Sequence, residues 1–169
     1  MTAHRVMGRA WVFGDNVNTD NMYPHICYTL PERDRPKYTM WANRPGWAEQ
    51  VRPGDLLVAG KNFGLGSSRP AATNLLMLGI RAVFAESVNG LFLRNAVNVG
   101  LPAVAVPGIT SAVTEGQTLE ADLDEGWVRT EEGEEIRFRP LPAFLMEIID
   151  AGGIIEVLRA RGLLSEEPL

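Results

Sequence analysis

The segment at residues 59–69, AGKNFGLGSSR, holds the residue types in this chain that are best suited to chemistry. It carries glycines at positions 60, 64 and 66, and it ends in Ser67, Ser68 and Arg69. Glycine lets a backbone approach a ligand closely, and arginine offers a fork of donors that suits a carboxylate or a phosphate. The segment is not a nucleotide-binding P-loop, because no Lys-Ser or Lys-Thr pair follows its last glycine. These residues predict an anion-binding turn of another kind.

The flanking residues place this turn between a strand and a helix. Residues 55–59 form a short apolar run typical of a buried strand, and residues 71–79 predict a helix closed by glycine. We expect Ser67 or Ser68 to cap that helix and Pro70 to lie in its first turn. The unpaired N–H groups of a first helical turn attract anions. Many purely structural turns share this pattern, so the turn alone leaves an anion site and a structural role about equally open.

A second polar segment, residues 14–21, follows an apolar strand predicted at residues 8–13. It contains Asp15 and Asp20, which flank Thr19. Two carboxylates in such a loop either bond to nearby backbone as Asx turns or orient a catalytic group. The residues themselves leave both interpretations open, with the structural one favoured.

Further elements follow in alternation. Strands are predicted at residues 80–85 and 101–106, and helices at residues 88–99, 142–151 and 154–161. Two successive strand–helix–strand units predict a parallel sheet with right-handed crossovers. The turn at residues 59–69 then lies at the carboxyl edge of a strand, where open α/β sheets bind ligands.

The remaining segments have a different character. Residues 114–139 alternate in polarity and predict a β-meander with an acidic exterior. Residues 22–35, which hold His25, Cys27 and Tyr28, are broken by prolines and predict an extended loop, and residues 37–50 predict one or two short helical turns.

The length, charge and composition of the chain exclude several classes of function. At 169 residues the chain is expected to form one domain over residues 1–169, and its net charge of −5 without a Lys/Arg cluster argues against nucleic-acid binding. No apolar run reaches membrane-spanning length, and the first residues lack a secretory pattern, which predicts a cytoplasmic protein. Cys27 is the single cysteine, and the two histidines are His4 and His25. We therefore expect no metal site and no iron–sulfur cluster on this chain.

Three motifs together resemble a known family. They are FGDNVNTD at residues 13–20; VRPGD at residues 51–55 with NFGLGSSR at residues 62–69; and GIRAV, AES, FLRN and GLP between residues 79 and 102. In order and spacing they are similar to the small subunit of the 3-isopropylmalate dehydratase type, which corresponds to the swivelling fourth domain of aconitase. The likeness covers nearly the whole chain.

The resemblance implies an α/β fold of the aconitase swivel type, with a barrel-like β core flanked by helices. It implies a hydro-lyase that removes and re-adds water on a hydroxy di- or tricarboxylate, in leucine biosynthesis. It also implies a heterodimer in which the large subunit carries a 4Fe–4S cluster, while this chain carries no cofactor. One iron of that cluster binds the substrate hydroxyl as a Lewis acid.

The family's functional residues map onto four positions. The resemblance implies that Ser67 is the catalytic base, that Ser68 and Arg69 bind substrate carboxylates, and that Asp20 supports a histidine on the large subunit. Elementary chemistry agrees, because a serine hydroxyl becomes basic only where a helix N-terminus, amide donors and a guanidinium stabilise its anion.

The chain also departs from the family pattern. Pro70-Ala71-Ala72 stands where most members have glutamate, an aromatic residue and alanine, which suggests a roomier or more apolar wall. The loop after Asp20 differs too, and we expect residues 26–30 to contact the variable substituent of the substrate. Alternatives are therefore a homoaconitase, a dimethylmalate dehydratase or another hydroxyacid dehydratase. A non-catalytic anion-binding module is the alternative from a different class.

Overall fold

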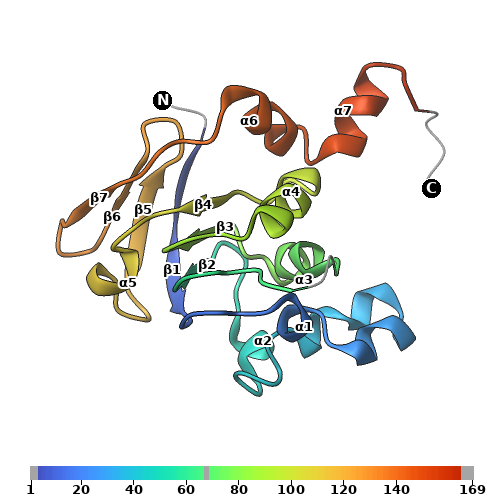
Figure 1. Ribbon diagram of the computed structural model, residues 1–169, viewed down its shortest axis with the longest axis horizontal. Coiled ribbons are helices and arrows are strands. Elements are labelled where there is room, and N and C mark those ends of the chain that lie inside the picture. Colours follow the sequence, from blue (N-terminus) through green and yellow to red (C-terminus); the bar gives the residue numbers. More distant parts are fainter. Residues whose placement is uncertain (1–3, 67–68, 165–169) are drawn as a thin grey trace.

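A seven-stranded sheet runs through the protein in the order β4-β3-β2-β1-β5-β6-β7 (Figure 1). The computed structural model describes residues 4–66 and 69–164. The strands are β1 (Arg5–Val12), β2 (Leu56–Ala59), β3 (Ala82–Ala85), β4 (Ala103–Ala105), β5 (Thr118–Asp122), β6 (Trp127–Arg129) and β7 (Glu135–Arg137). Strands β1 to β4 pair in parallel, whereas β5, β6 and β7 form an antiparallel meander. The predicted parallel units and the predicted meander are both confirmed.

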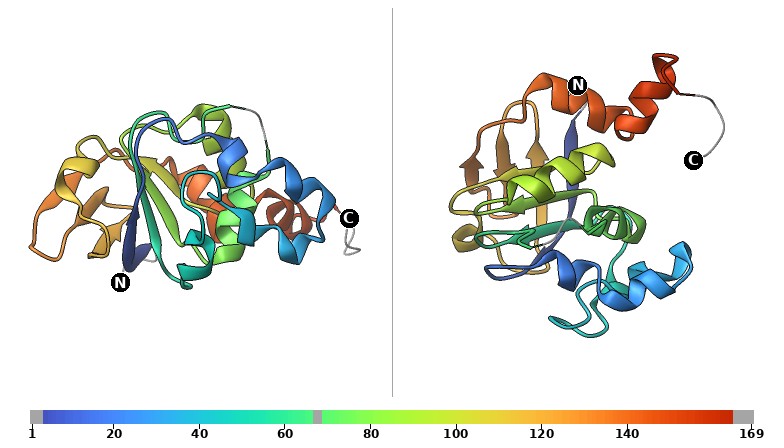
Figure 2. Two further views of the ribbon diagram at one scale, coloured as in Figure 1. Left: turned by 90° about the horizontal axis from the view of Figure 1, so that it is seen from below. Right: turned by 45° about the vertical axis from the view of Figure 1, so that its right-hand side comes forward.

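Strand β1 belongs to both parts of the sheet. Its residues Ala10 to Val12 pair in parallel with β2, and its residues Arg5 to Arg9 pair antiparallel with β5. The sheet curls about this shared strand, so that the meander turns over one face of the parallel part (Figure 2). The result is a half-barrel, which confirms the expected barrel-like core.

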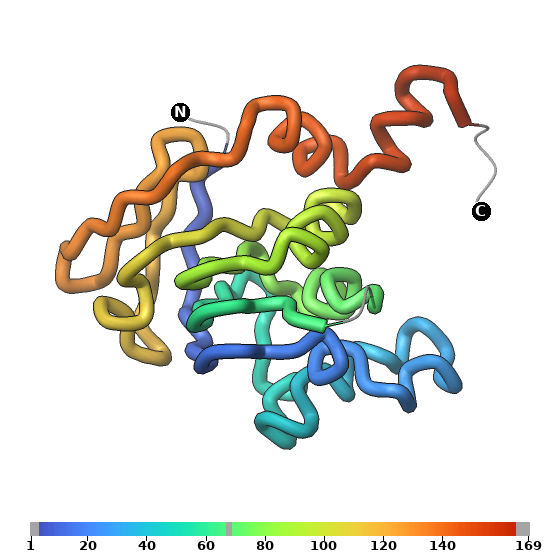
Figure 3. Tube along the Cα trace, viewed as in Figure 1, coloured from blue at the N-terminus to red at the C-terminus, as the bar shows by residue number. Residues whose placement is uncertain are grey.

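Helices and helical turns occupy the connections between strands and the segment that follows β7 (Figure 3). The α-helices are α1 (Thr19–Met22), α2 (Trp47–Gln50), α3 (Ala71–Leu78), α4 (Gly90–Asn98), α5 (Ile109–Ala112), α6 (Ala143–Asp150) and α7 (Ile154–Ala160). The 3₁₀ turns are η1 (His25–Thr29), η2 (Glu32–Asp34) and η3 (Pro36–Tyr38). Helices α3 and α4 are the crossovers between parallel strands. Within the described ranges, no helix combines the length and the apolarity that a membrane crossing requires.

The parallel strands are buried on both faces. All four residues of β2 and all four of β3 are buried, which explains their unbroken apolar runs. Leu57 lies in the cluster that packs beneath α1, α3 and α4, whereas its neighbours Leu56 and Val58 lie in the cluster that packs against the meander. The sheet therefore separates two hydrophobic cores.

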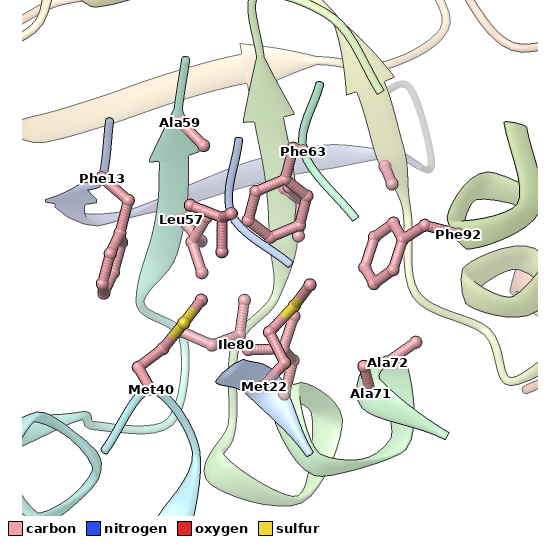
Figure 4. Close-up of a cluster of buried hydrophobic side chains, with 14 of the residues drawn as sticks. Phe13, Met22, Met40, Leu57, Ala59, Phe63, Ala71, Ala72, Ile80 and Phe92 are labelled. Carbon is pink, nitrogen blue, oxygen red and sulfur yellow. The ribbon is translucent and has the colours of Figure 1, made fainter. Parts of the chain in front are cut away.

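The first of these cores fixes the elements that follow β1 and β2. Figure 4 shows Met22, at the end of α1, and Met40 among side chains that include Leu57 and Ile80. Ala71, at the start of α3, faces the same cluster and is fully buried. Close-packed interiors hold side chains in defined positions, so α1 and the beginning of α3 share one rigid support.

The expectation of an extended loop at residues 22–35 is wrong. The segment folds into 3₁₀ turns, and Tyr23 and Cys27 are buried in the core. The prolines that suggested a break stand instead at the starts of these turns, with Pro24 and Pro31 immediately before η1 and η2. A proline is tolerated there because its missing N–H would have no partner within the turn.

A buried carboxylate fastens the amino end of β2 to β1. Asp55 accepts hydrogen bonds from Arg9 Nη2 at 2.6 Å, from Trp11 Nε1 at 2.7 Å and from the Arg52 amide at 2.9 Å. Burial on its own would raise the pKa of Asp55, but these hydrogen bonds and the Arg9 charge outweigh it and hold the pKa below its usual value. The ionised form therefore stabilises the fold.

We predict that Asp55→Asn lowers the free energy of unfolding at neutral pH by about 1.5–3 kcal/mol, the range for hydrogen bonds to a charged group. Because the pKa is depressed in the folded state, the difference from wild type should be complete above the unfolded pKa. It should shrink as the pH falls through the folded pKa. Urea denaturation at a series of pH values measures this.

The matched control is Asp34→Asn. Asp34 pairs with Lys37 at 3.5 Å on the surface, where both side chains are more than a third exposed. Loss of such a pair should change stability by less than about 0.5 kcal/mol. Equal effects of the two substitutions would contradict the role assigned to Asp55.

Candidate active site

Two loops lie side by side at the carboxyl ends of β1 and β2. The Gly60 amide donates to the Gly14 carbonyl at 3.1 Å, and the Asn16 amide donates to the Lys61 carbonyl at 2.7 Å. Asp15 does not make the predicted local turn with its Oδ1, which instead accepts from the Lys61 amide at 2.7 Å. The first of the two candidate carboxylates is thus a structural clamp between loops.

The glycines of the second loop are required by this close approach. A Cβ at Gly60 would lie 2.0 Å from Asp15 Oδ1, and a Cβ at Gly66 would lie 2.5 Å from Asn18 Oδ1. Gly66 also has a φ of 104°, which disfavours other residues. Within the described residues, these two glycines therefore bring the second loop against the first.

A third loop, which follows β3, lies at the same carboxyl edge of the parallel strands. The Phe63 amide donates to the Ser87 carbonyl at 3.0 Å, and the Asn89 amide donates to the Phe63 carbonyl at 2.8 Å. The Asn62 amide donates to Ser87 Oγ at 2.9 Å. The segment that leads into the serines is therefore hydrogen-bonded to loops on both sides.

Asp20 and Arg69 meet at this edge. Arg69 Nε lies 2.7 Å from Asp20 Oδ1, and Arg69 Nη1 donates to the Tyr23 carbonyl at 2.9 Å. The Asp20 side chain is 51% exposed and the Arg69 side chain 20% exposed. A pair as exposed as this contributes little stability, so its main effect is to orient the guanidinium.

Local sequence explains the position of Asp20. Asn18 caps the short helix α1, because its side chain accepts from the Asp20 amide at 2.8 Å. Leu65 fixes the same turn from the other loop, since its carbonyl accepts from the Thr19 amide at 2.8 Å. An Asn before Thr-Asp is a sequence signal for a helix N-cap. The contact with Leu65 has no such signal in the sequence.

The predicted helix at residues 71–79 is confirmed as α3, but the expectation that Pro70 lies in its first turn is wrong. The helix begins at Ala71, the cap position is occupied by Pro70, and no side chain caps it there. The ring of Pro70 disfavours helical backbone at the residue before it, and this keeps Arg69 out of the helix. The predicted capping serines, Ser67 and Ser68, lie outside the described residues.

The three residues that depart from the family pattern do not form an open wall. Ala71 and Ala72 are 0% and 2% exposed and belong to the core beneath α3. Of the three, only Pro70 is exposed. The roomier pocket wall that the sequence suggested is therefore not contributed by these alanines.

The 3₁₀ segment after α1 brings an aromatic ring to the site. The Tyr28 ring centre lies 5.8 Å from Arg69 Cζ and 5.1 Å from the Tyr23 ring, and Tyr28 is 55% exposed. This ring forms one side of the surroundings of Arg69. It belongs to the segment, residues 26–30, that we expected to contact substrate.

Beneath Tyr28, a buried polar residue holds this segment. Asn74 Nδ2 in α3 donates to the Met22 carbonyl at 3.1 Å and lies 3.9 Å from Cys27 Sγ. Burial raises the pKa of the Cys27 thiol, although the contact with Asn74 and the charges of Arg35 and Arg69 oppose the shift. Our sequence reasoning missed Asn74; a lone amide in an apolar helix was the available signal.

The titratable groups elsewhere in the described chain do not form a competing centre. No group of three or more His, Cys, Asp and Glu side chains among the described residues could hold a metal ion. A cavity of about 760 Å³ lies at the amino ends of the parallel strands and is lined by Gly54, Gly79 and Gly100, among others. It shares neither Asp20 nor Arg69, so it is separate from the site at the carboxyl edge.

Comparison with solved structures defines the class of fold. The protein is similar to the crystal structure of 3-isopropylmalate dehydratase from Methanocaldococcus jannaschii, with a TM-score of 0.88 and 33% identity. The similarity covers 95% of this chain and 96% of that one. The half-barrel is thus the aconitase swivel fold, as the sequence predicted.

The sequence comparisons define the family. The model of the aconitase C-terminal domain matches residues 13–107, and the chain belongs to this family. It is 44% identical over 160 residues to 3-isopropylmalate dehydratase small subunit 1 of Methanopyrus kandleri, covering 93% of this chain and 94% of the relative. It is 42% identical to the isopropylmalate/citramalate isomerase small subunit of Methanocaldococcus jannaschii, covering 92% and 95%. The predicted family is confirmed.

We predict that Gly60→Ala lowers the free energy of unfolding by about 1–3 kcal/mol, because the new methyl group overpacks the contact with Asp15. Gly14→Ala is the control, since a Cβ there meets nothing within 4 Å and should change stability by less than about 0.5 kcal/mol. Thermal and urea denaturation of both variants measure the difference. A Gly60→Ala protein as stable as wild type would show that the two loops are not closely held.

Proposed function

We propose that this chain is the small subunit of a hydro-lyase of the 3-isopropylmalate dehydratase type. With a large subunit, it dehydrates and rehydrates a hydroxy di- or tricarboxylate. The observation that carries the proposal is the placement of Arg69 beside Asp20, directly after the Gly-Ser-Ser sequence at the carboxyl edge of the parallel strands. The names of the relatives support the same activity.

Arg69 is suited to hold a substrate carboxylate. A guanidinium presents paired N–H donors to carboxylate oxygens, and Asp20 and the Tyr23 carbonyl fix its plane. A carbon-bound proton next to a carboxylate is removed more readily when a positive charge offsets the negative charge of that carboxylate. Arg69 thus both binds the substrate and lowers the barrier to proton removal.

Ser67 is our candidate for the base, and Ser68 for a second carboxylate ligand. Ser67 precedes Arg69 by two positions in the sequence, and a guanidinium stabilises an alkoxide or a carboxylate that lies close to it. Asp20 is half exposed, which leaves its carboxylate accessible to a histidine of the large subunit. These assignments rest on the family motif together with the Asp20–Arg69 geometry.

Departure of the hydroxyl group is assigned to the partner. The 4Fe–4S cluster expected on the large subunit supplies a Lewis acid for that hydroxyl. Cys27, the single cysteine of this chain, is buried and suited to packing rather than to cluster ligation. An unpaired cysteine also fits a protein of the reducing cytoplasm, where we place the enzyme.

The test is anaerobic reconstitution with the large subunit, followed by hydratase assays on hydroxyacids of different chain length. We expect turnover of at least one isopropylmalate-like substrate. Ser67→Ala should lower kcat by about 10²–10⁴-fold, the contribution typical of a positioned general base, while the subunits still assemble. Ser111→Ala, in α5 and at a different position in the chain, is the control and should retain full activity. Wild-type turnover by the Ser67→Ala complex would remove Ser67 from the mechanism.

We also propose that Tyr28 selects the substrate's variable substituent, because its ring lies beside Arg69. Tyr28→Ala should change the ratio of kcat/KM between a short and a long hydroxyacid by about 10-fold or more, the scale of one methylene in an apolar pocket. Tyr28→Phe keeps the ring and should keep the ranking. An unchanged ranking in the alanine variant would place the selecting contact elsewhere.

A further inference from the structure

We infer that Asn74 is a positioning residue, whose buried amide holds α1 where Asp20 and the Tyr23 carbonyl orient Arg69. Asn74 lies within α3, five positions after Arg69, and is 1% exposed. This inference rests on the proposed function, because it concerns the same site. It goes beyond that function by assigning a role to a residue outside the motifs at residues 13–20 and 62–69.

Helix α1 is too short to fix its own position. It has four residues, and a single helical turn makes too few internal hydrogen bonds to be stable alone. Its backbone carbonyls therefore need donors from other segments. Three consecutive carbonyls at its end accept from outside it, in the pairs Asn21 with the Met40 amide at 2.8 Å, Met22 with Asn74 Nδ2 at 3.1 Å, and Tyr23 with Arg69 Nη1 at 2.9 Å.

Two of these three donors come from one continuous stretch of chain. Arg69 precedes α3 and Asn74 lies within it, and they donate to the adjacent carbonyls of Tyr23 and Met22. Attachments to two neighbouring peptide groups define both the distance and the rotation of α1 relative to α3. Without the Asn74 bond the end of α1 keeps fewer polar contacts, and the Tyr23 carbonyl gains freedom relative to the guanidinium.

The surroundings of Asn74 favour an apolar residue at this position. Ala71 and Leu75, in the same helix, are fully buried, and the Met22 side chain lies in the same cluster (Figure 4). A buried amide costs free energy unless it is hydrogen-bonded, and asparagine is a poorer helix former than leucine. The bond to the Met22 carbonyl therefore explains why an asparagine stands here.

The same amide also contacts the segment that carries Tyr28. Asn74 Nδ2 lies 3.9 Å from Cys27 Sγ, and Cys27 is fully buried. Tyr28 follows Cys27 directly, and its ring centre lies 5.8 Å from Arg69 Cζ. One side chain of α3 thus contacts two segments, α1 and η1, that both reach Arg69.

The consequence for the site follows from the geometry of the guanidinium. Arg69 Nε lies 2.7 Å from Asp20 Oδ1, and Arg69 Nη1 donates to the Tyr23 carbonyl. Because Asp20 lies in α1 and Tyr23 directly follows it, a shift of α1 turns the plane of the guanidinium. A misplacement of about 1 Å can cost about 10²-fold in rate. Asn74 therefore acts through Arg69.

The first measurement uses the isolated full chain and needs no activity. Asn74→Leu removes the donor and keeps a side chain of similar size. With ¹⁵N-labelled arginine, NMR observes the Nε–H signal of Arg69, which is assigned by its loss in Arg69→Lys. We expect Asn74→Leu to shift this signal and to speed its exchange with water. If Asn74→Leu does not fold, Asn74→Ala replaces it in every measurement.

Thr130→Val is the matched control. Thr130 is 5% exposed, and its Oγ1 accepts from the Glu134 amide at 3.2 Å in the meander. Both variants lose one buried hydrogen bond, so both should lower the melting temperature. Only Asn74→Leu should move the Arg69 signal.

The second measurement uses the reconstituted complex. Asn74→Leu should lower kcat/KM by about 10²-fold and raise KM, whereas Thr130→Val should leave both unchanged. Lysine lacks the planar fork of arginine, so in an Arg69→Lys background Asn74→Leu should lower kcat/KM by no more than about twofold. A residue with a purely structural role would give the same factor in both backgrounds.

An unmoved Arg69 signal in folded Asn74→Leu protein would overturn the inference. So would a wild-type kcat/KM for this variant, or an equal loss of kcat/KM in the two backgrounds. If the wild-type complex turns over no hydroxyacid, a moved signal would support the positioning of Arg69 and refute only the proposed function. The two proposals therefore fail separately.

Discussion

Parallel pairing of β1 with β2 is the constraint on which the site depends. It places the ends of two strands side by side, so that the loops that follow them must also run together. The clamp from Asp15 to the Lys61 amide then sets the distance between those loops, and glycines at 60 and 66 permit it. Only in this arrangement do Asp20 and Arg69, which lie far apart in the chain, come within 2.7 Å.

The two hydrophobic cores explain why the polar chemistry gathers at one edge. Because β2 and β3 are buried on both faces, a charged side chain within them would have no water and no partner. The loops after the strands are the nearest positions where charges remain hydrated. Met22 and Met40 pack beneath these loops and give a rigid base to groups that must be held in a defined orientation.

The sequence predicted the elements well where a regular period or a glycine marked them, as in α3, whose C-cap is Gly79. It failed where proline has two meanings: Pro24 and Pro31 begin helical turns instead of breaking them, and Pro70 holds the cap position of α3. Motifs indicated Asp20 and Arg69 as candidate site residues, and the structure brings their side chains together. Their contact could not be foreseen, nor could that of Asp15 with Lys61, 46 positions away, because such pairs are fixed by strand register and not by neighbouring residues.

The double pairing of β1 has a consequence for synthesis on the ribosome. One edge of this strand waits for β2, and the other waits for β5, as the contact between Arg5 and Asp122 across 117 positions illustrates. During that delay the strand presents open N–H and C=O groups, which readily pair with another chain. A nascent polypeptide of this family must therefore prevent its first strand from pairing with other chains until most of its length has emerged from the ribosome.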